Sequence, residues 1–169
     1  MADYGISTLG IRLAYATEST AGTRPTTDNN YTLLHRINAI GGITAEPEVI
    51  DASALEDEIT HNIKGRTTIS DTVSITVNLT TETVSEWNTL ISTYDALTGG
   101  KGMWFQVYYD GKITDGAGTP KAQSFYFKAQ PPAQLPMPES NQNELQTVEI
   151  PLVVEDVEGY ADSKIVIPT

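Results

Sequence analysis

The chain has 169 residues, of which 39% are hydrophobic, which suits one domain with a single core rather than a disordered chain. A net charge of −12 argues against binding nucleic acid by phosphate neutralisation, and the absence of cysteine excludes disulfides and thiolate chemistry. We expect no signal peptide and no membrane insertion, because the sequence lacks a basic region followed by an apolar one and any apolar run of about 18 residues.

Most of the sequence is typical of β-strands, which we predict in chain order at 9–18, 31–40, 72–80, 102–111, 124–130 and 145–155. Strand 72–80 is the most regular, because apolar side chains alternate with Ser, Thr and Asn. Strands 102–111 and 124–130 are rich in aromatic residues and should pair as an antiparallel hairpin. Pro151 cannot donate a backbone hydrogen bond, so its strand should lie at an edge or be bulged there.

The acidic segment at about 46–68 is predicted to be a long loop between two strands. Its apolar residues follow neither the alternation of a strand nor a long helical stripe. Loops of this length are uncommon in compact domains and are usually functional or disordered. Scattered Val, Leu and Ile argue against disorder, and they have no evident local partner, so we expect them to be buried against another molecule.

One amphipathic helix is predicted within 83–100. Thr83 and Glu86 have the spacing of a capping box, and two glycines follow the end of the pattern. The face that we expect to pack against a sheet holds Val84, Trp87, Leu90, Ile91 and Tyr94.

Together these elements predict a mainly β fold with two packed antiparallel sheets, sandwich-like or barrel-like, with one flanking α-helix and long loops. Residues 1–169 should form a single domain, with possible assembly arms at both termini. Segments 17–30 and 131–144 are polar or proline-rich and are predicted to be loops.

No catalytic, cofactor or metal site is predicted. His35 and His61 are the only histidines, and no HxxxH or HExxH spacing is present. Lys101 is followed by Gly, where a phosphate-binding loop needs Ser or Thr, and no GxSxG elbow occurs. We therefore expect no enzymatic activity.

The order of the elements, a strand, an acidic segment, a Ser/Thr-rich strand, one helix and an aromatic hairpin, resembles the major tail tube protein of long-tailed (siphovirus) bacteriophages. The local likeness is strongest over 43–80, which includes "VIDASALEDEITHNIKGR". The segment "GIRLAYATESTAGT" is also similar, as a first strand that leads into a loop of small residues. Arg66 departs from the pattern, since many relatives carry an apolar residue after the glycine.

This resemblance implies a structural virion protein with the fold of contractile-tail and type VI secretion tubes. Six subunits would form a ring, and stacked rings would enclose a negatively charged channel that conducts the genome during ejection. The implied partners are further copies of the chain, the tape measure protein, the tail terminator and baseplate or distal tail proteins, while double-stranded DNA passes without specific binding. The protein would be made in the host cytoplasm and located in the virion tail.

The resemblance also suggests contact residues. The segment at 46–68 resembles a loop that reaches the neighbouring ring, with candidate contacts at Val49, Asp51, Leu55, Glu56, Asp57, Ile59, Ile63, Lys64 and Arg66. We expect strand 72–80 to line the channel with 31–40 as its partner, through the uncharged side chains of Ser74, Thr76, Asn78 and Thr80. Glu149 on strand 145–155 could equally point inward.

Two other interpretations stay open. The chain could be a β-sandwich carbohydrate-binding or adhesin-like module, with Trp87, Trp104 and Tyr108 as a platform for sugars. It could also be another virion protein, such as a capsid decoration protein. Self-assembly separates a tube subunit from a binding module, which should stay monomeric at high concentration.

Overall fold

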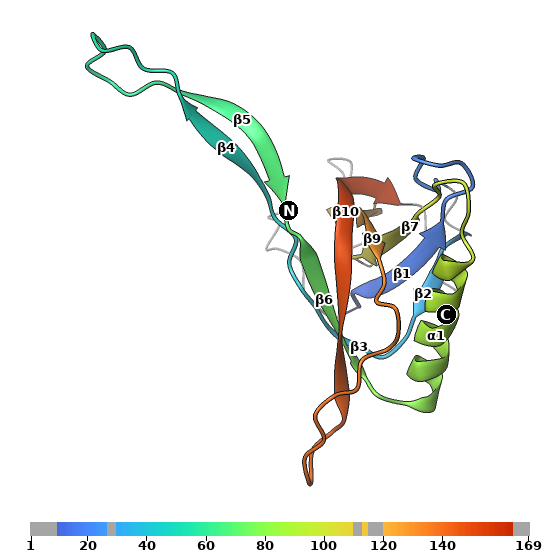
Figure 1. Cartoon of the computed structure of the whole chain (residues 1–169). Coiled ribbons are helices and arrows are strands. Elements are labelled where there is room, and N and C mark those ends of the chain that lie inside the picture. The colour runs from blue at the N-terminus through green and yellow to red at the C-terminus, as the bar shows by residue number, and fades with distance from the viewer. Residues whose placement is uncertain (1–9, 27–29, 110–112, 115–119, 164–169) are drawn as a thin grey trace.

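The computed structural model describes residues 10–26, 30–109, 113–114 and 120–163. In chain order the elements are β1 (Arg12–Thr17), β2 (Thr32–Leu34), β3 (Ile37–Ile40), β4 (Ala45–Asp51), β5 (Asn62–Ile69), β6 (Thr72–Asn78), α1 (Thr81–Asp95), β7 (Met103–Tyr108), β8 (Ile113–Thr114), β9 (Pro120–Gln130) and β10 (Thr147–Ser163). All strand pairs are antiparallel and form a large sheet and a separate two-stranded one (Figure 1). The predicted mainly β fold with two antiparallel sheets and one helix is confirmed.

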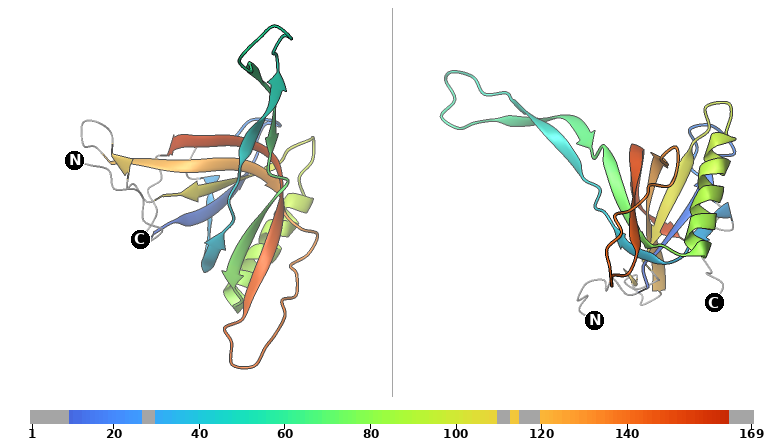
Figure 2. Two further views of the ribbon diagram at one scale, coloured as in Figure 1. Left: turned by 90° about the vertical axis from the view of Figure 1, so that its left-hand side faces the viewer. Right: turned by 60° about the horizontal axis from the view of Figure 1, so that its bottom comes forward.

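The large sheet has the strand order β2-β1-β7-β9-β10-β6-β3, with β8 paired to β9. β10 joins its two halves, because its first part pairs with β6 and its part from Val153 onward pairs with β9. The register with β9 shifts twice, after Val154 and after Val157, and Gly159 adopts a φ of 92°. Such bulges bend a strand, and Figure 2 shows β10 turning from one half of the sheet into the other. The sheet therefore bends at β10, so that its two halves face each other.

One hydrophobic core fills the space between the two halves and α1. Val73, Ile75 and Val77 of β6 alternate inward, and the rings of Phe105 and Phe127 stack with centroids 5.5 Å apart. Further core residues are Leu13, Trp87, Leu90, Ile91, Met103, Val148, Ile150 and Leu152. The apolar residues whose alternation predicted β6 are therefore the buried residues of that strand.

The helix begins one turn earlier than predicted. Thr80 is its N-cap, accepting a hydrogen bond from the backbone N–H of Thr83 at 3.2 Å, while the Thr83 hydroxyl accepts from the Thr80 N–H. The Thr83 side chain is buried and also donates to the carbonyl of Asn78. Thr83, rather than Val84, therefore faces the sheet. Val84 is half-exposed and lies outside the core cluster, which corrects its predicted place on the packed face.

The segment 31–40, predicted as one strand, is two short strands at opposite edges of the sheet. β2 pairs with β1, and β3 pairs with β6. Only His35 and Arg36 separate them, and Arg36 has a φ of 58°, which breaks the extended backbone. Because the two edge strands meet at this break, the sheet curls toward a barrel without closing into one. The predicted pairing of 31–40 with 72–80 holds only for β3.

The aromatic hairpin is present, since β7 pairs with β9 from Trp104 opposite Lys128 to Tyr108 opposite Ser124. Pro151 lies in the part of β10 that has β6 on one side, before β9 begins to pair at Val153. Its missing N–H is thus accommodated at a locally free edge, as predicted. Residues 131–146 contain no strand or helix. The suggested terminal arms, at 1–9 and 164–169, lie outside the described residues.

Across the described residues, no helix is both long and apolar enough to cross a membrane.

Candidate assembly surfaces

The segment predicted as a long loop is a β-hairpin that projects from the body of the molecule (Figures 1 and 2). We call residues 45–69, which comprise β4, the tip 52–61 and β5, the arm. The arm continues the β3–β6 pair outward, because the Gly41 N–H bonds the Ser74 carbonyl and the Ser70 N–H bonds the Thr44 carbonyl. It leaves the body on the side away from α1. The prediction of a loop is therefore wrong in its local structure. The segment does leave the body, but its two halves pair with each other as strands.

A bulge explains why the arm lacks a strand's alternation. Pro47 pairs with Thr67 and Val49 with Lys64, so two residues of β5 oppose the single residue Glu48. One of the two is Gly65, where a Cβ would lie 3.1 Å from the Ile50 side chain and 3.2 Å from the Glu48 carbonyl. A side chain here would be tight against both neighbours, so glycine suits the close approach of the two strands. The extra residue shifts the apolar pattern by one position and hides the strand.

The tip is held by its own hydrogen bonds. The Ala52 N–H donates to the His61 carbonyl at 2.8 Å, and the His61 N–H donates to the Ser53 hydroxyl at 2.7 Å. Asp51 accepts from the Ser53 N–H at 2.9 Å, and hydrogen bonds from Ser53 hold the pKa of this exposed carboxyl below its ordinary value. The tip therefore has a defined shape, and its hydrogen bonds with described residues all lie within the arm.

The apolar side chains of the arm are exposed to solvent. Val49 is 69% exposed, Ile59 73% and Ile63 55%, and Leu55 is fully exposed at the tip. Ile50 and Ile63 are cross-strand partners on one face, whereas Val49 shares the other face with Lys64. Between 45 and 69 the chain carries six carboxylates and two cations, Lys64 and Arg66. The predicted contact residues thus lie together on one projecting element that is apolar and acidic at once.

The predicted channel-lining residues are only partly brought together. Ser74, Thr76 and Asn78 lie half-exposed on the face of β6 opposite the core. Thr80 does not belong to this face, because it caps α1. Glu149 of β10 is the cross-strand partner of Thr76 and is exposed on the same face. A carboxylate therefore lies within the polar face itself, where the sequence pattern of β6 alone showed only uncharged groups.

The proposed sugar platform is not available, because Trp87, Trp104 and Tyr108 are buried. Trp104 donates its indole N–H to Glu18 at 2.8 Å. Glu18 is itself buried and also accepts from the backbone N–H groups of Gly22 and Gly102, and Lys128 lies 3.3 Å away. Burial alone would raise the pKa of Glu18, but these hydrogen bonds outweigh it and hold the pKa below its ordinary value. This network anchors the loop after β1, and it is structural.

The loop after β1 covers the second face of β1, β7 and β9. The Arg24 guanidinium lies 4.0 Å from the centre of the Tyr126 ring and pairs with Glu158, and the Tyr31 ring is 5.9 Å from the Tyr126 ring. Beneath them, the side chain of Gln106 donates to the Tyr126 hydroxyl. Tyr126 and Gln106 are therefore buried beneath this loop and are not open to a ligand.

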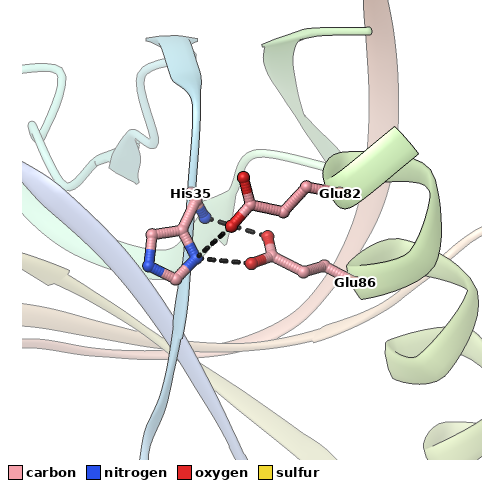
Figure 3. A group of neighbouring side chains, drawn as sticks. All are labelled: His35, Glu82 and Glu86. Carbon is pink, nitrogen blue, oxygen red and sulfur yellow. Dashed lines mark hydrogen bonds and ion pairs between the residues drawn. The ribbon is translucent and has the colours of Figure 1, made fainter. Parts of the chain in front are cut away.

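One group of potential metal-ligating side chains was not predicted from the sequence. His35, at the break between β2 and β3, lies beside Glu82 and Glu86 of α1 (Figure 3). The histidine is more than forty positions from the two glutamates in the sequence, so no motif spacing could have revealed it.

The sequence matches no family model, and no curated protein resembles it. Chains of similar structure occur in solved assemblies, including the following three. A chain of the anti-feeding prophage (AFP) tube-terminating cap has a TM-score of 0.56 at 14% identity, covering 96% of this chain and 95% of that chain. A chain of the AFP baseplate has a TM-score of 0.54 at 10% identity, covering 98% and 100%. A chain of the PVC sheath–tube complex, an extracellular contractile injection system in the extended state, has a TM-score of 0.51 at 12% identity, covering 92% and 90%. The protein therefore has a tail-tube-like fold that occurs in phage-tail-like injection systems.

Proposed function

We propose that this chain is a non-enzymatic, structural subunit of a phage tail tube, whose copies form hexameric rings that stack around a channel for DNA. The observation that carries this proposal is the arm, an ordered hairpin whose apolar side chains stay exposed among the described residues. The fold shared with chains of tube-containing injection systems supports it.

The arm is suited to contact a neighbouring copy. Burying a Val, Leu or Ile fully contributes about 1.5–3 kcal/mol, so Val49, Leu55, Ile59 and Ile63 together could stabilise an interface by several kcal/mol. In the isolated subunit the same side chains remain in water. Both outer edges of the hairpin are also open, and exposed edges are the part of a sheet that pairs with another chain. The carboxylates of the arm would pair with basic groups of the next ring.

The channel wall in this proposal is the polar face of β6 and β10. Ser74, Thr76 and Asn78 are short and uncharged, and Glu149 beside Thr76 supplies negative charge. Six copies of such a face around one axis would repel phosphate, so DNA would slide without binding. Other partners would be a tape measure protein, a tail terminator and baseplate or distal tail proteins, and the site of action would be the tail of a siphovirus-type virion.

The first experiment concerns assembly. The purified chain should form rings or tubes with a central hole in negative-stain electron microscopy at high concentration or with a tail initiator. The variant Ile59→Asp/Ile63→Asp should stay folded by circular dichroism and fail to stack. Its matched control is Thr60→Asp/Asn62→Asp, which adds the same charge at neighbouring exposed positions without removing apolar surface. The control should still assemble.

Two outcomes would contradict the proposal. A chain that sediments as a monomer at every concentration and forms no tube with an initiator is not a tube subunit. Equal assembly of the variant and the control would remove the arm from the interface.

The second experiment concerns the channel. Thr76→Lys/Asn78→Lys should permit tube assembly and slow DNA passage, with the delay shrinking as salt is raised. In a reconstruction of the tube, these lysines should point into the channel. Lysines on the outer wall would overturn the choice of channel face while leaving the tube itself in place.

A further inference from the structure

Three potential metal ligands converge where the sheet breaks between β2 and β3. Glu82 and Glu86 are one turn apart on α1 and both point toward the ring of His35 (Figure 3). The Nδ1 atom of His35 is 3.9 Å from a carboxylate oxygen of Glu82 and hydrogen-bonded to one of Glu86. One nitrogen and one oxygen from each carboxylate lie within 4.8 Å of one another.

The second carboxylate oxygen of Glu86 fixes the geometry. It accepts a hydrogen bond from the backbone N–H of His35 at 3.0 Å, which satisfies a donor left unpaired by the break in the sheet. This bond holds the histidine against the helix and orients the carboxylate, as hydrogen bonds to ligating carboxylates do in metal sites. Glu82, in contrast, has only the long contact to His35 among the interactions of the described residues, so its carboxylate is available.

The cluster lacks a permanent positive charge. Within the described part of the chain, neither glutamate forms an ion pair with Lys or Arg. Carboxylates four positions apart on a helix repel each other, although the positive end of the helix dipole offsets part of this. A cation between the two carboxylates and the imidazole would remove the repulsion.

We propose that His35, Glu82 and Glu86 form a binding site for a divalent transition-metal cation, with Zn²⁺ as the best-fitting representative. Zinc binds imidazole nitrogen and carboxylate oxygen at about 2.0–2.2 Å, so donors around one ion lie within about 4.4 Å of one another. To reach this geometry, the exposed Glu82 side chain has to rotate and the hydrogen bond between His35 Nδ1 and Glu86 has to open, with loss of its proton, so that the ion lies between the two atoms. An imidazole ligand disfavours Ca²⁺ and Mg²⁺, which take oxygen ligands.

The bound ion acts as a structural staple. It connects the first two turns of α1 to His35, in the two-residue link between β2 and β3. These two strands are the opposite edges of the sheet. The inference needs only the folded subunit and is independent of the proposed function.

The test is isothermal titration calorimetry of the purified chain with ZnCl₂ and, separately, CaCl₂, with thermal unfolding measured with and without EDTA. The intact chain should bind one Zn²⁺ per subunit, at least about tenfold more tightly than Ca²⁺, and zinc should raise its Tm until EDTA is added. His35→Gln and Glu82→Gln should each weaken zinc binding by at least about tenfold. Glu82→Gln is preferred to a change at Glu86. The Glu86 carboxylate accepts a hydrogen bond from the His35 backbone, so replacing it would also disturb the local fold.

His61→Gln is the matched control, since it removes the other histidine, which lies beside acidic residues at the arm tip. It should leave zinc binding unchanged. No zinc binding by the intact chain would overturn the proposal and leave the cluster as a histidine–glutamate hydrogen bond. Equal binding by Glu82→Gln, or an equal loss with His61→Gln, would equally overturn it, because binding would then reflect the acidic surface in general.

Discussion

Two antiparallel strand pairs in this molecule carry the same kinds of apolar residues, but these side chains are buried in one pair and exposed in the other. In the β6–β10 pair, Ile75 and Ile150 are fully buried between the sheet halves and α1. In the β4–β5 pair, Ile50 and Ile63 are cross-strand partners too, yet both are about half exposed. Residue type does not distinguish the pairs. What differs is that β6–β10 packs on a second layer within the subunit, whereas no such layer covers β4–β5 in the described part of the chain.

This difference separates a body that is stabilised within the subunit from an arm that is only partly stabilised there. An isolated two-stranded hairpin is marginally stable in water, so the arm depends on its tip hydrogen bonds and on its connection to the β3–β6 pair. The body, in contrast, is stabilised by its hydrophobic core. Mutations in the body should therefore change the free energy of unfolding, and mutations in the arm should change assembly.

The largest effect is expected for Ile75→Ala. The side chain is fully buried in the core, and its truncation leaves a cavity, so the variant should lose about 2–5 kcal/mol of unfolding free energy. Urea unfolding followed by circular dichroism measures this loss. A loss below about 1 kcal/mol would mean that β6 is not packed as described and would erase the contrast with the arm.

Glu18→Gln tests the polar side of the same contrast. The carboxylate is buried with four partners, and replacement should cost about 2–3 kcal/mol, because hydrogen bonds to charged groups are strong. Since the folded-state pKa of Glu18 is lowered, its stabilisation is complete above the ordinary value of 4.5 and is lost as pH falls through the folded-state pKa. The variant should therefore show a flatter loss of stability with acid.

Asp51, one of the six carboxylates of the arm, gives the control for Glu18. Asp51→Asn changes a fully exposed group whose hydrogen bonds among the described residues are with Ser53 of the arm, and it should change the acid unfolding curve of the subunit less than Glu18→Gln does. An acid curve of Glu18→Gln that overlays that of the unaltered chain would mean that Glu18 is not paired in solution.

A smaller effect is expected for Thr80→Ala. Loss of the N-cap hydrogen bond should reduce the unfolding free energy by about 1 kcal/mol, whereas Thr81→Ala, one position into the helix, should have less effect. Thermal unfolding of the two variants compares them directly. Should Thr81→Ala prove the more damaging, the helix begins elsewhere and the exclusion of Thr80 from the polar face of β6 is wrong.

The smallest effect on the subunit is expected for Ile63→Ala, which should change its unfolding free energy by less than about 0.5 kcal/mol, because the side chain is 55% exposed. Measured beside Ile75→Ala, it makes the comparison of the two strand pairs quantitative. A cost similar to that of Ile75→Ala would show that the arm folds back onto the body in solution.

Much of the body could be predicted from local pattern. The alternation of Val73, Ile75 and Val77, the aromatic hairpin and the apolar face at Trp87, Leu90 and Ile91 all lie where the sequence indicated. The exceptions have local causes that a periodic pattern does not register. The bulge at Gly65 hid the strands of the arm, and the positive φ of Arg36 divided one expected strand into two.

The sequence by itself determined the mainly β class, the single helix, the absence of cysteine chemistry and the position of an acidic, apolar excursion, because these follow from composition and from contacts between near neighbours. Only the tertiary structure decided which apolar strands are covered, since burial depends on whether a second layer reaches them. It also brought His35 to Glu82 and Glu86, and Glu149 to Thr76, because such pairs form when distant segments meet at a sheet edge or across two strands.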